Sequence, residues 1–238
     1  MNKLIEESLF NYGKKLLTII FWICFQGTAW AQNSTKTDKG SATSNSPVIV
    51  ESMIGSKGLN LQTIFSKQLT PESRFGIFGI ADLYGVYNTH EQVFRNQQMA
   101  QTHLTYRIAK GLNLSAGAFF ENHSGFRPTV GLQYNLFHKN LHLLLAPRID
   151  LSQTYNGEIL ALGEYTSRIK GDWKFYSRVQ GLYNRDLKNN LPSVSYIWGR
   201  IGASYKTYRF GVGGNFYWLG PQKMTENNIG LFFGALLY

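Results

Sequence analysis

The segment Glu121-Asn122-His123-Ser124-Gly125 brings a carboxylate, an imidazole and a hydroxyl together, the residue types of a hydrolytic site. A base activates a hydroxyl only when both side chains lie on one side of the backbone within hydrogen-bond reach. The segment falls at the end of an expected strand, where residues i and i+1 point to opposite faces. Ser115, which shares the face of His123, lies about 26 Å away at 3.3 Å per residue. We therefore predict no catalytic residues, and a hydrolase centred on His123 is the weakest alternative.

The remaining histidines, His90, His103, His138 and His142, show no compact metal-binding spacing such as H-E-x-x-H. The chain has one cysteine, Cys24, so a cysteine-ligated metal site and a disulfide within the chain are both excluded. We predict neither a metal nor a cofactor.

A second candidate site consists of charged residues at alternating positions of neighbouring expected strands. A turn at 170–172 pairs Arg168 with Lys174 and Glu164 with Arg178, and the next loop brings Arg178 near Arg200. On other hairpins, Arg148 lies diagonal to Glu164, Ser152 faces Glu158, His142 faces Arg168 and Glu121 faces Arg127, with cross-strand side chains about 5 Å apart. The predicted constriction contains Arg148, Glu164, Arg168, Lys174, Arg178, Arg200, Glu121 and Arg127.

Two interpretations of this charged band remain open. In the first, rings of arginine form an electropositive constriction that favours anions. In the second, the interior is filled and its charges neutralise one another. The excess of arginine over glutamate favours the constriction.

Composition indicates which fold positions these residues. Only 16% of the 238 residues are charged, against roughly 25% in soluble domains, which argues against disordered and coiled-coil chains. A mean hydropathy of −0.21 argues against a polytopic helical membrane protein. The 24 Gly, 14 Tyr and 16 Phe without long apolar runs are typical of an outer-membrane β-barrel.

The N-terminus predicts export. Lys3, Lys14 and Lys15 precede the apolar run 16–24, and Ala29-Trp30-Ala31 forms a small-residue cleavage site. We expect a signal peptide over 1–31, cleaved before Gln32; an uncleaved anchor is the alternative, although a spanning helix needs about 20 apolar residues. Cleavage leaves 21 basic and 12 acidic residues, a net charge of +9. In an exported chain this charge favours outer-membrane lipid, lipopolysaccharide phosphate or anionic solutes over nucleic acid as partners.

Residues 32–46 are polar and lack periodicity, which predicts a flexible tether. The remainder, 47–238, predicts an all-β, single transmembrane antiparallel up-and-down barrel of about 12 strands, or ten if the first hairpin is false. The expected strands are 47–55, 58–67, 74–87, 96–109, 112–124, 126–137, 141–153, 157–169, 173–185, 194–205, 209–219 and 228–238. Short turns on the periplasmic side and longer loops at 88–95, 186–193 and 220–227 on the other fit that class.

The alternation of apolar and polar residues along the strands predicts which face of the barrel wall contacts lipid and which faces the lumen. Strand 173–185 places Trp173, Phe175, Val179 and Tyr183 opposite a face with Lys174, Arg178 and Gln180. In an exported barrel we expect the apolar face to contact lipid, whereas a soluble periplasmic barrel, the alternative, would reverse the faces.

The last strand resembles the C-terminal signal of outer-membrane barrels, which ends on an aromatic residue preceded by small or apolar residues at alternating positions. Gly230, Phe232, Gly234, Leu236 and Tyr238 fit that pattern. A signal peptide ending before Gln is similar to those of Bacteroidetes-type outer-membrane proteins. The resemblance implies a Gram-negative outer-membrane location and recognition by the barrel-assembly machinery.

We therefore expect a porin-like channel for small, anionic solutes. A non-enzymatic barrel in assembly, adhesion or a larger envelope complex, with a periplasmic or envelope partner protein, is the first alternative. An outer-membrane lipid hydrolase is the second.

Overall fold

A computed structural model of the chain describes residues 46–87, 96–122, 124–153 and 155–238. The chain divides into two compact units, 1–41 and 42–238, and every described residue belongs to the second. The expected signal peptide, almost all of the expected tether and His123 lie outside the described residues.

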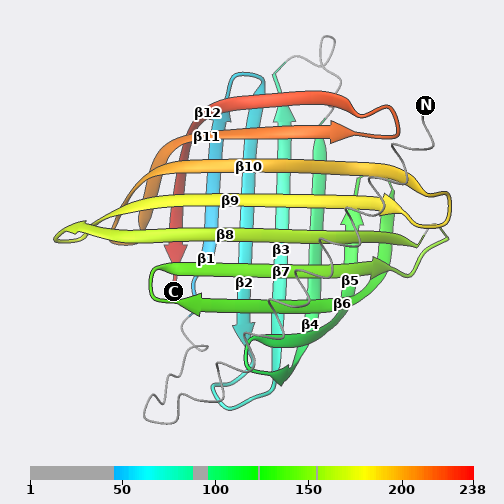
Figure 1. Cartoon of the computed structure of the whole chain (residues 1–238), viewed down its shortest axis with the longest axis horizontal. Coiled ribbons are helices and arrows are strands. Elements are labelled where there is room, and N and C mark those ends of the chain that lie inside the picture. Colours follow the sequence, from blue (N-terminus) through cyan, green and yellow to red (C-terminus); the bar gives the residue numbers. More distant parts are fainter. Residues whose placement is uncertain (1–45, 88–95, 123, 154) are drawn as a thin grey trace, which may run out of the picture. The chain divides into compact units, whose positions relative to one another are not determined.

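The second unit is a closed antiparallel up-and-down barrel of twelve strands, as predicted (Figure 1). Each strand pairs with its neighbours in sequence, and β1 pairs with β12 to close the barrel. The strands are β1 (Val48–Gly55), β2 (Gly58–Gln68), β3 (Phe75–Val86), β4 (Gln97–Ala109), β5 (Leu112–Glu121), β6 (Gly125–His138), β7 (Leu141–Asp150), β8 (Asn156–Lys170), β9 (Trp173–Asp186), β10 (Leu191–Tyr205), β11 (Tyr208–Leu219) and β12 (Met224–Leu237).

The connections define two ends of the barrel. The turn end holds the connections 69–74, 110–111, 139–140, 171–172 and 206–207, together with the start of β1 and the end of β12. These turns gather toward the left and lower edges of Figure 1. The loop end holds the other connections, from 56–57 to 220–223.

Two expected loops at the loop end are shorter than predicted. Strand β10 begins at Leu191 and β12 at Met224, which reduces the connections to 187–190 and 220–223. Asn190 and Lys223 have positive φ values of 58° and 52°, the backbone conformation that tight hairpins require. The outer end of β12 looked like a loop in the sequence because three of its first four residues, Thr225, Glu226 and Asn227, are polar.

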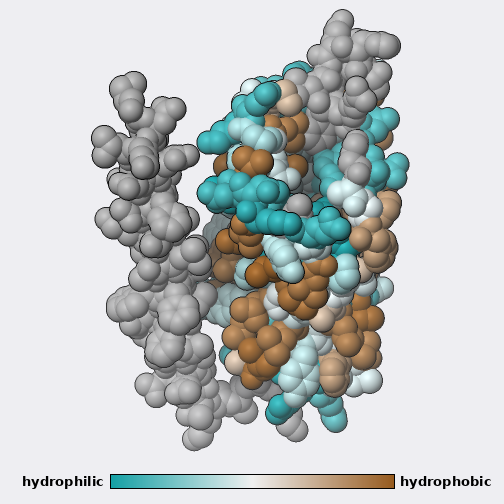
Figure 2. Space-filling view, turned by 90° about the vertical axis from the view of Figure 1, so that its right-hand side faces the viewer, coloured by the Kyte–Doolittle hydropathy of each residue, from teal (hydrophilic) through white to brown (hydrophobic). Residues whose placement is uncertain are grey.

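The two faces of the barrel wall are oriented as predicted. Large apolar side chains such as Leu104, Val179 and Leu231 are exposed on the outer surface, whereas polar side chains of the same strands are buried inside. Figure 2 shows a broad zone of apolar residues on one side of the barrel, with hydrophilic residues toward its ends. In the described part of the chain, no helix is long and apolar enough to cross a membrane.

The interior of the barrel is filled by side chains. An apolar cluster from both walls includes Phe78, Leu160, Tyr196, Trp198 and Tyr217. The rings of Tyr196 and Trp198 stack with centroids 4.6 Å apart. Twelve strands therefore enclose a packed core here, because bulky inward-facing residues alternate with the outward-facing apolar ones.

Candidate functional site in the barrel lumen

The centre of the lumen holds one carboxylate between two guanidinium groups. Arg178 Nη2 and Arg200 Nε donate to the same Glu51 oxygen, Oε1, at 2.6 and 2.8 Å. Arg200 Nη1 also donates to Asn215 Oδ1 at 2.8 Å. Glu51, Arg178 and Arg200 are only 2%, 1% and 3% exposed. We call these four residues the central cluster.

Glycines let Arg200 reach across two strands toward Glu51. Arg200 on β10 is paired with Gly213 on β11, which is paired with Gly230 on β12. A Cβ on Gly213 would lie 2.8 Å from Arg200 Cδ, so a larger residue there would displace the arginine. The glycine-rich stretch of β11 therefore makes room for the side chain that completes the central cluster.

A second group of ion pairs lies nearer the loop end. Arg148 donates to both oxygens of Glu158, at 2.9 and 2.8 Å, and also contacts Asp150. Arg127 bridges Asp150 at 3.1 Å and Glu121 at 3.3 Å. Each cation in this outer cluster is therefore shared between two carboxylates.

Phe119 lies between the two arginines of the outer cluster. The guanidinium carbons of Arg127 and Arg148 lie 4.8 and 4.1 Å from the centre of its ring. Cation–π contacts of this kind hold arginine side chains in one orientation.

A third ion pair lies toward the turn end. Arg209 Nη1 donates to Glu164 Oε2 at 3.0 Å, and its second amino group donates to the other oxygen. The Arg209 guanidinium carbon also lies 4.5 Å from the Tyr176 ring centre. Along its whole length the lumen thus holds bidentate or shared ion pairs, which are the strongest kind of charged hydrogen bond.

The structure brings together part of the predicted constriction. Glu164 and Arg178 are cross-strand neighbours, as are Arg178 and Arg200. Glu121 and Arg127 form an ion pair, although Arg127 lies directly opposite Phe119. Arg168 and Lys174 are paired as predicted, and both side chains are exposed at the turn end.

The predicted register between β7 and β8 is wrong. Arg148 lies opposite Glu158 rather than diagonal to Glu164, and His142 lies opposite Glu164 rather than Arg168. Strand β7 ends at Asp150, because Leu151 to Gln153 leave the ladder for the loop. Apolar alternation continues to Leu151 in the sequence, so the pattern alone did not show where the strand stops.

The predicted constriction did not include four partners of these arginines and glutamates: Glu51, Asp150, Glu158 and Arg209. Each is a charged residue at an inward-facing position of an expected strand, and this position was the available signal. Glu51 lies in the least certain expected strand and is 149 residues from Arg200. Their inclusion removes most of the arginine excess on which the electropositive constriction was based.

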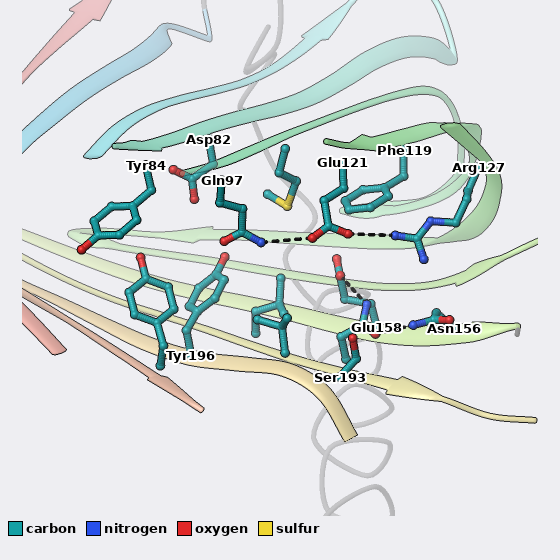
Figure 3. Close-up of a pocket in the computed structure, with 15 residues that line it drawn as sticks. Asp82, Tyr84, Gln97, Phe119, Glu121, Arg127, Asn156, Glu158, Ser193 and Tyr196 are labelled. Carbon is teal, nitrogen blue, oxygen red and sulfur yellow. Dashed lines mark hydrogen bonds and ion pairs between the residues drawn. The ribbon is translucent and has the colours of Figure 1, made fainter. Parts of the chain in front are cut away.

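A small chamber of about 40 Å³ lies in the outer part of the lumen (Figure 3). Gln97, Glu121 and Arg127 form a hydrogen-bonded row along one side, and Tyr196 and Glu158 come from the opposite wall. This volume holds a few water molecules, and a second cavity near His103 measures about 10 Å³.

Some buried polar groups in the lumen lack protein partners. Both side-chain amide atoms of Gln62 and of Gln133 form no hydrogen bond within the described residues, and each residue is 1% exposed. Buried amides of this kind normally bind ordered water. They indicate that parts of the lumen wall are suited to hydration.

The segment that resembles a hydrolytic site is engaged in other contacts. The Ser124 hydroxyl donates to Glu121 at 2.7 Å and accepts from Arg127 at the same distance. Among the described residues, no cluster of His, Cys, Asp and Glu could hold a metal ion.

No protein-family model and no curated protein matches the chain. Among solved structures, the NanC porin is 12% identical, with a TM-score of 0.45 over 80% of this chain and 99% of the porin. The KdgM porin in complex with disordered oligogalacturonate is 11% identical, with the same TM-score and coverage. LpxR from Salmonella typhimurium is 9% identical, with a TM-score of 0.40 over 81% of this chain and all of that chain. The chain is a closed twelve-stranded antiparallel barrel, similar in general fold to these proteins.

Proposed function

We propose that the protein is a porin-like outer-membrane barrel with a sealed lumen, a non-enzymatic component of the envelope that acts through its ends and outer surface. The apolar outer face supports the membrane location, because lipid tolerates only closed barrels and helices. The main support for a sealed lumen is the buried central cluster, in which Arg178 and Arg200 both donate to Glu51.

In a conducting pore, the arginines of a constriction face water and bind passing anions. Arg178 and Arg200 instead donate to Glu51 and are almost fully buried. Burying two arginines is tolerable only when a carboxylate and further hydrogen bonds compensate them. The central cluster therefore stabilises a closed state, in which both arginines are buried and paired with Glu51.

A narrow passage for small solutes, anions included, is the second candidate function. The unpartnered amides of Gln62 and Gln133 favour it, because a hydrated path along the wall would satisfy them. In this candidate, solutes pass when the central cluster rearranges, and the cluster sets the size limit.

The discriminating experiment is conductance of the purified protein in a planar bilayer under a salt gradient. Insertion is verified separately by the shift of the unheated band on a denaturing gel. An inserted barrel without conductance steps supports the sealed lumen. Steps in the wild-type protein, with a reversal potential that changes in an Arg178→Gln/Arg200→Gln variant, would instead support the passage.

A further inference from the structure

The positive charge of the described chain is concentrated at one end of the barrel. Seven cationic side chains are exposed at the turn end: Arg74, Lys110, Lys139, Arg168, Lys170, Lys174 and Lys206. We call them the basic rim. None of them forms an ion pair within the described part of the chain.

The excess of cationic over acidic residues is confined to the turn end. Counting the half-buried Lys67 and Arg107, the turn end holds nine cationic residues against two acidic ones, Glu72 and Asp172, a net charge of +7. Among the described residues, the loop end holds six of each sign. Its cations are Lys57, Arg127, Arg148, Arg185, Lys188 and Lys223, and its acids are Asp82, Glu121, Asp150, Glu158, Asp186 and Glu226. Nearly all of the excess charge therefore faces one side of the membrane that the barrel spans.

The basic rim adjoins exposed aromatic residues on the outer wall. Trp173 and Tyr205 are exposed with ring centroids 5.0 Å apart, and each directly precedes a rim lysine in the sequence. The Lys206 ammonium lies 5.5 Å from the Tyr205 ring centre. Trp and Tyr settle at the headgroup level of a bilayer, and lysines extend their ammonium groups toward the phosphates.

We propose that the basic rim binds the headgroups of anionic phospholipids in the leaflet at the turn end. Lys110, Lys139, Lys170 and Lys206 lie on or beside four successive turns, β4–β5 to β10–β11, so the charge follows the circumference of the barrel. A ring of charge at headgroup depth fits a lipid annulus better than a single protein partner, which would need a one-sided patch. The inference rests on the proposed membrane location and adds a lipid preference and a fixed orientation to it.

The test uses the purified full chain in vesicles of phosphatidylcholine alone or mixed equally with phosphatidylglycerol. Energy transfer from the protein's tryptophans to dansyl-labelled phosphatidylglycerol or phosphatidylcholine reports which lipid is enriched around the barrel. We expect several-fold enrichment of the anionic lipid at low salt. Raising the ionic strength should abolish most of it, because the screening length falls from about 10 Å at 0.1 M to about 3 Å at 1 M.

Two matched variants locate the effect. Lys170→Gln/Lys206→Gln removes two charges from the basic rim, and Lys188→Gln/Lys223→Gln removes two from the loop end. The match extends to the backbone, because Lys206 and Lys223 both sit in turns with a φ of 52°. Since each basic residue near an anionic surface contributes about fivefold in affinity, the rim variant should lose most of the enrichment and the control should keep it.

Other outcomes overturn the inference. Equal losses in both variants would mean that net charge alone attracts the lipid. Displacement of the lipid by soluble poly-glutamate at low concentration would mean that the basic rim prefers an acidic macromolecule. Failure of the wild-type chain to insert into phosphatidylcholine vesicles, seen as no gel shift and no protease protection, would overturn the membrane location itself.

Discussion

Neutralising Glu51 should strongly destabilise the barrel. The Glu51→Gln substitution removes the only negative charge in the central cluster and leaves Arg178 and Arg200 buried without their ion-pair partner. Breaking a buried ion pair by removing one partner costs about 3–5 kcal/mol. Because this carboxylate serves two guanidinium groups, we expect a loss near the upper limit, about 5 kcal/mol in the free energy of unfolding.

The assay is urea-induced unfolding of the protein in lipid vesicles, followed by tryptophan fluorescence and by the gel shift. Glu72→Gln is the control, because Glu72 is an exposed turn residue whose loss should change stability by less than about 0.5 kcal/mol. Adding Arg178→Met to Glu51→Gln should recover part of the loss, since one of the two uncompensated charges is then gone.

A loss below about 1 kcal/mol for Glu51→Gln would refute this reasoning, because that is the value of a solvated ion pair. It would mean that water reaches Arg178 and Arg200, and the lumen would then have to be open. The same variant in the planar bilayer provides a second readout. If the cluster seals the lumen, its two uncompensated arginines should admit water and give anion-selective steps that the wild-type protein lacks.

Three further predictions follow from the same structure. Arg209→Met should lower the free energy of unfolding by about 3 kcal/mol in the urea assay, because Glu164 is then buried without its bidentate partner. Gly230→Ala should reduce the yield of heat-modifiable barrel, since its Cβ would lie 2.0 Å from a backbone oxygen of β1, whereas Gly199→Ala, with open space around it, should assemble normally. Fatty-acid release from vesicles should be absent in both the wild-type protein and Ser124→Ala, because the hydroxyl is held by Glu121; any release lost with Ser124 would establish a hydrolase.

In a barrel with a sealed lumen, the interior and the two ends have different roles from those in an open pore. The interior contributes stability through the apolar cluster and the three groups of ion pairs. Contacts with other molecules then fall to the two ends, which differ in net charge by about seven. The outer chamber is lined by Asp82, Glu121, Glu158 and Arg127 together with Tyr84 and Tyr196, so it presents charges of both signs at the loop end.

The sequence alone was sufficient for the fold class, the number of strands and the face that each strand presents to the outside. These properties depend on local alternation, because each strand must place apolar side chains on one face along its own length. Strand 173–185 is an example: Val179 is exposed on the outer wall and Arg178 is buried inside, as its pattern predicted. The turn-end lysines were equally visible, since turn positions follow from the strand boundaries.

Whether the lumen charges are compensated depends on contacts that form only in the folded barrel. The partners Glu51 and Arg200 come from strands three positions apart around the barrel, and they meet only because the chain closes through β1 and β12. The register between β7 and β8 is the second property that the sequence pattern did not determine. Because β7 ends earlier than expected, Arg148 lies opposite Glu158 and not diagonal to Glu164. Alternation fixes which face a residue occupies, whereas its depth in the lumen depends on hairpin register and barrel closure, which are set by the packing of the whole wall.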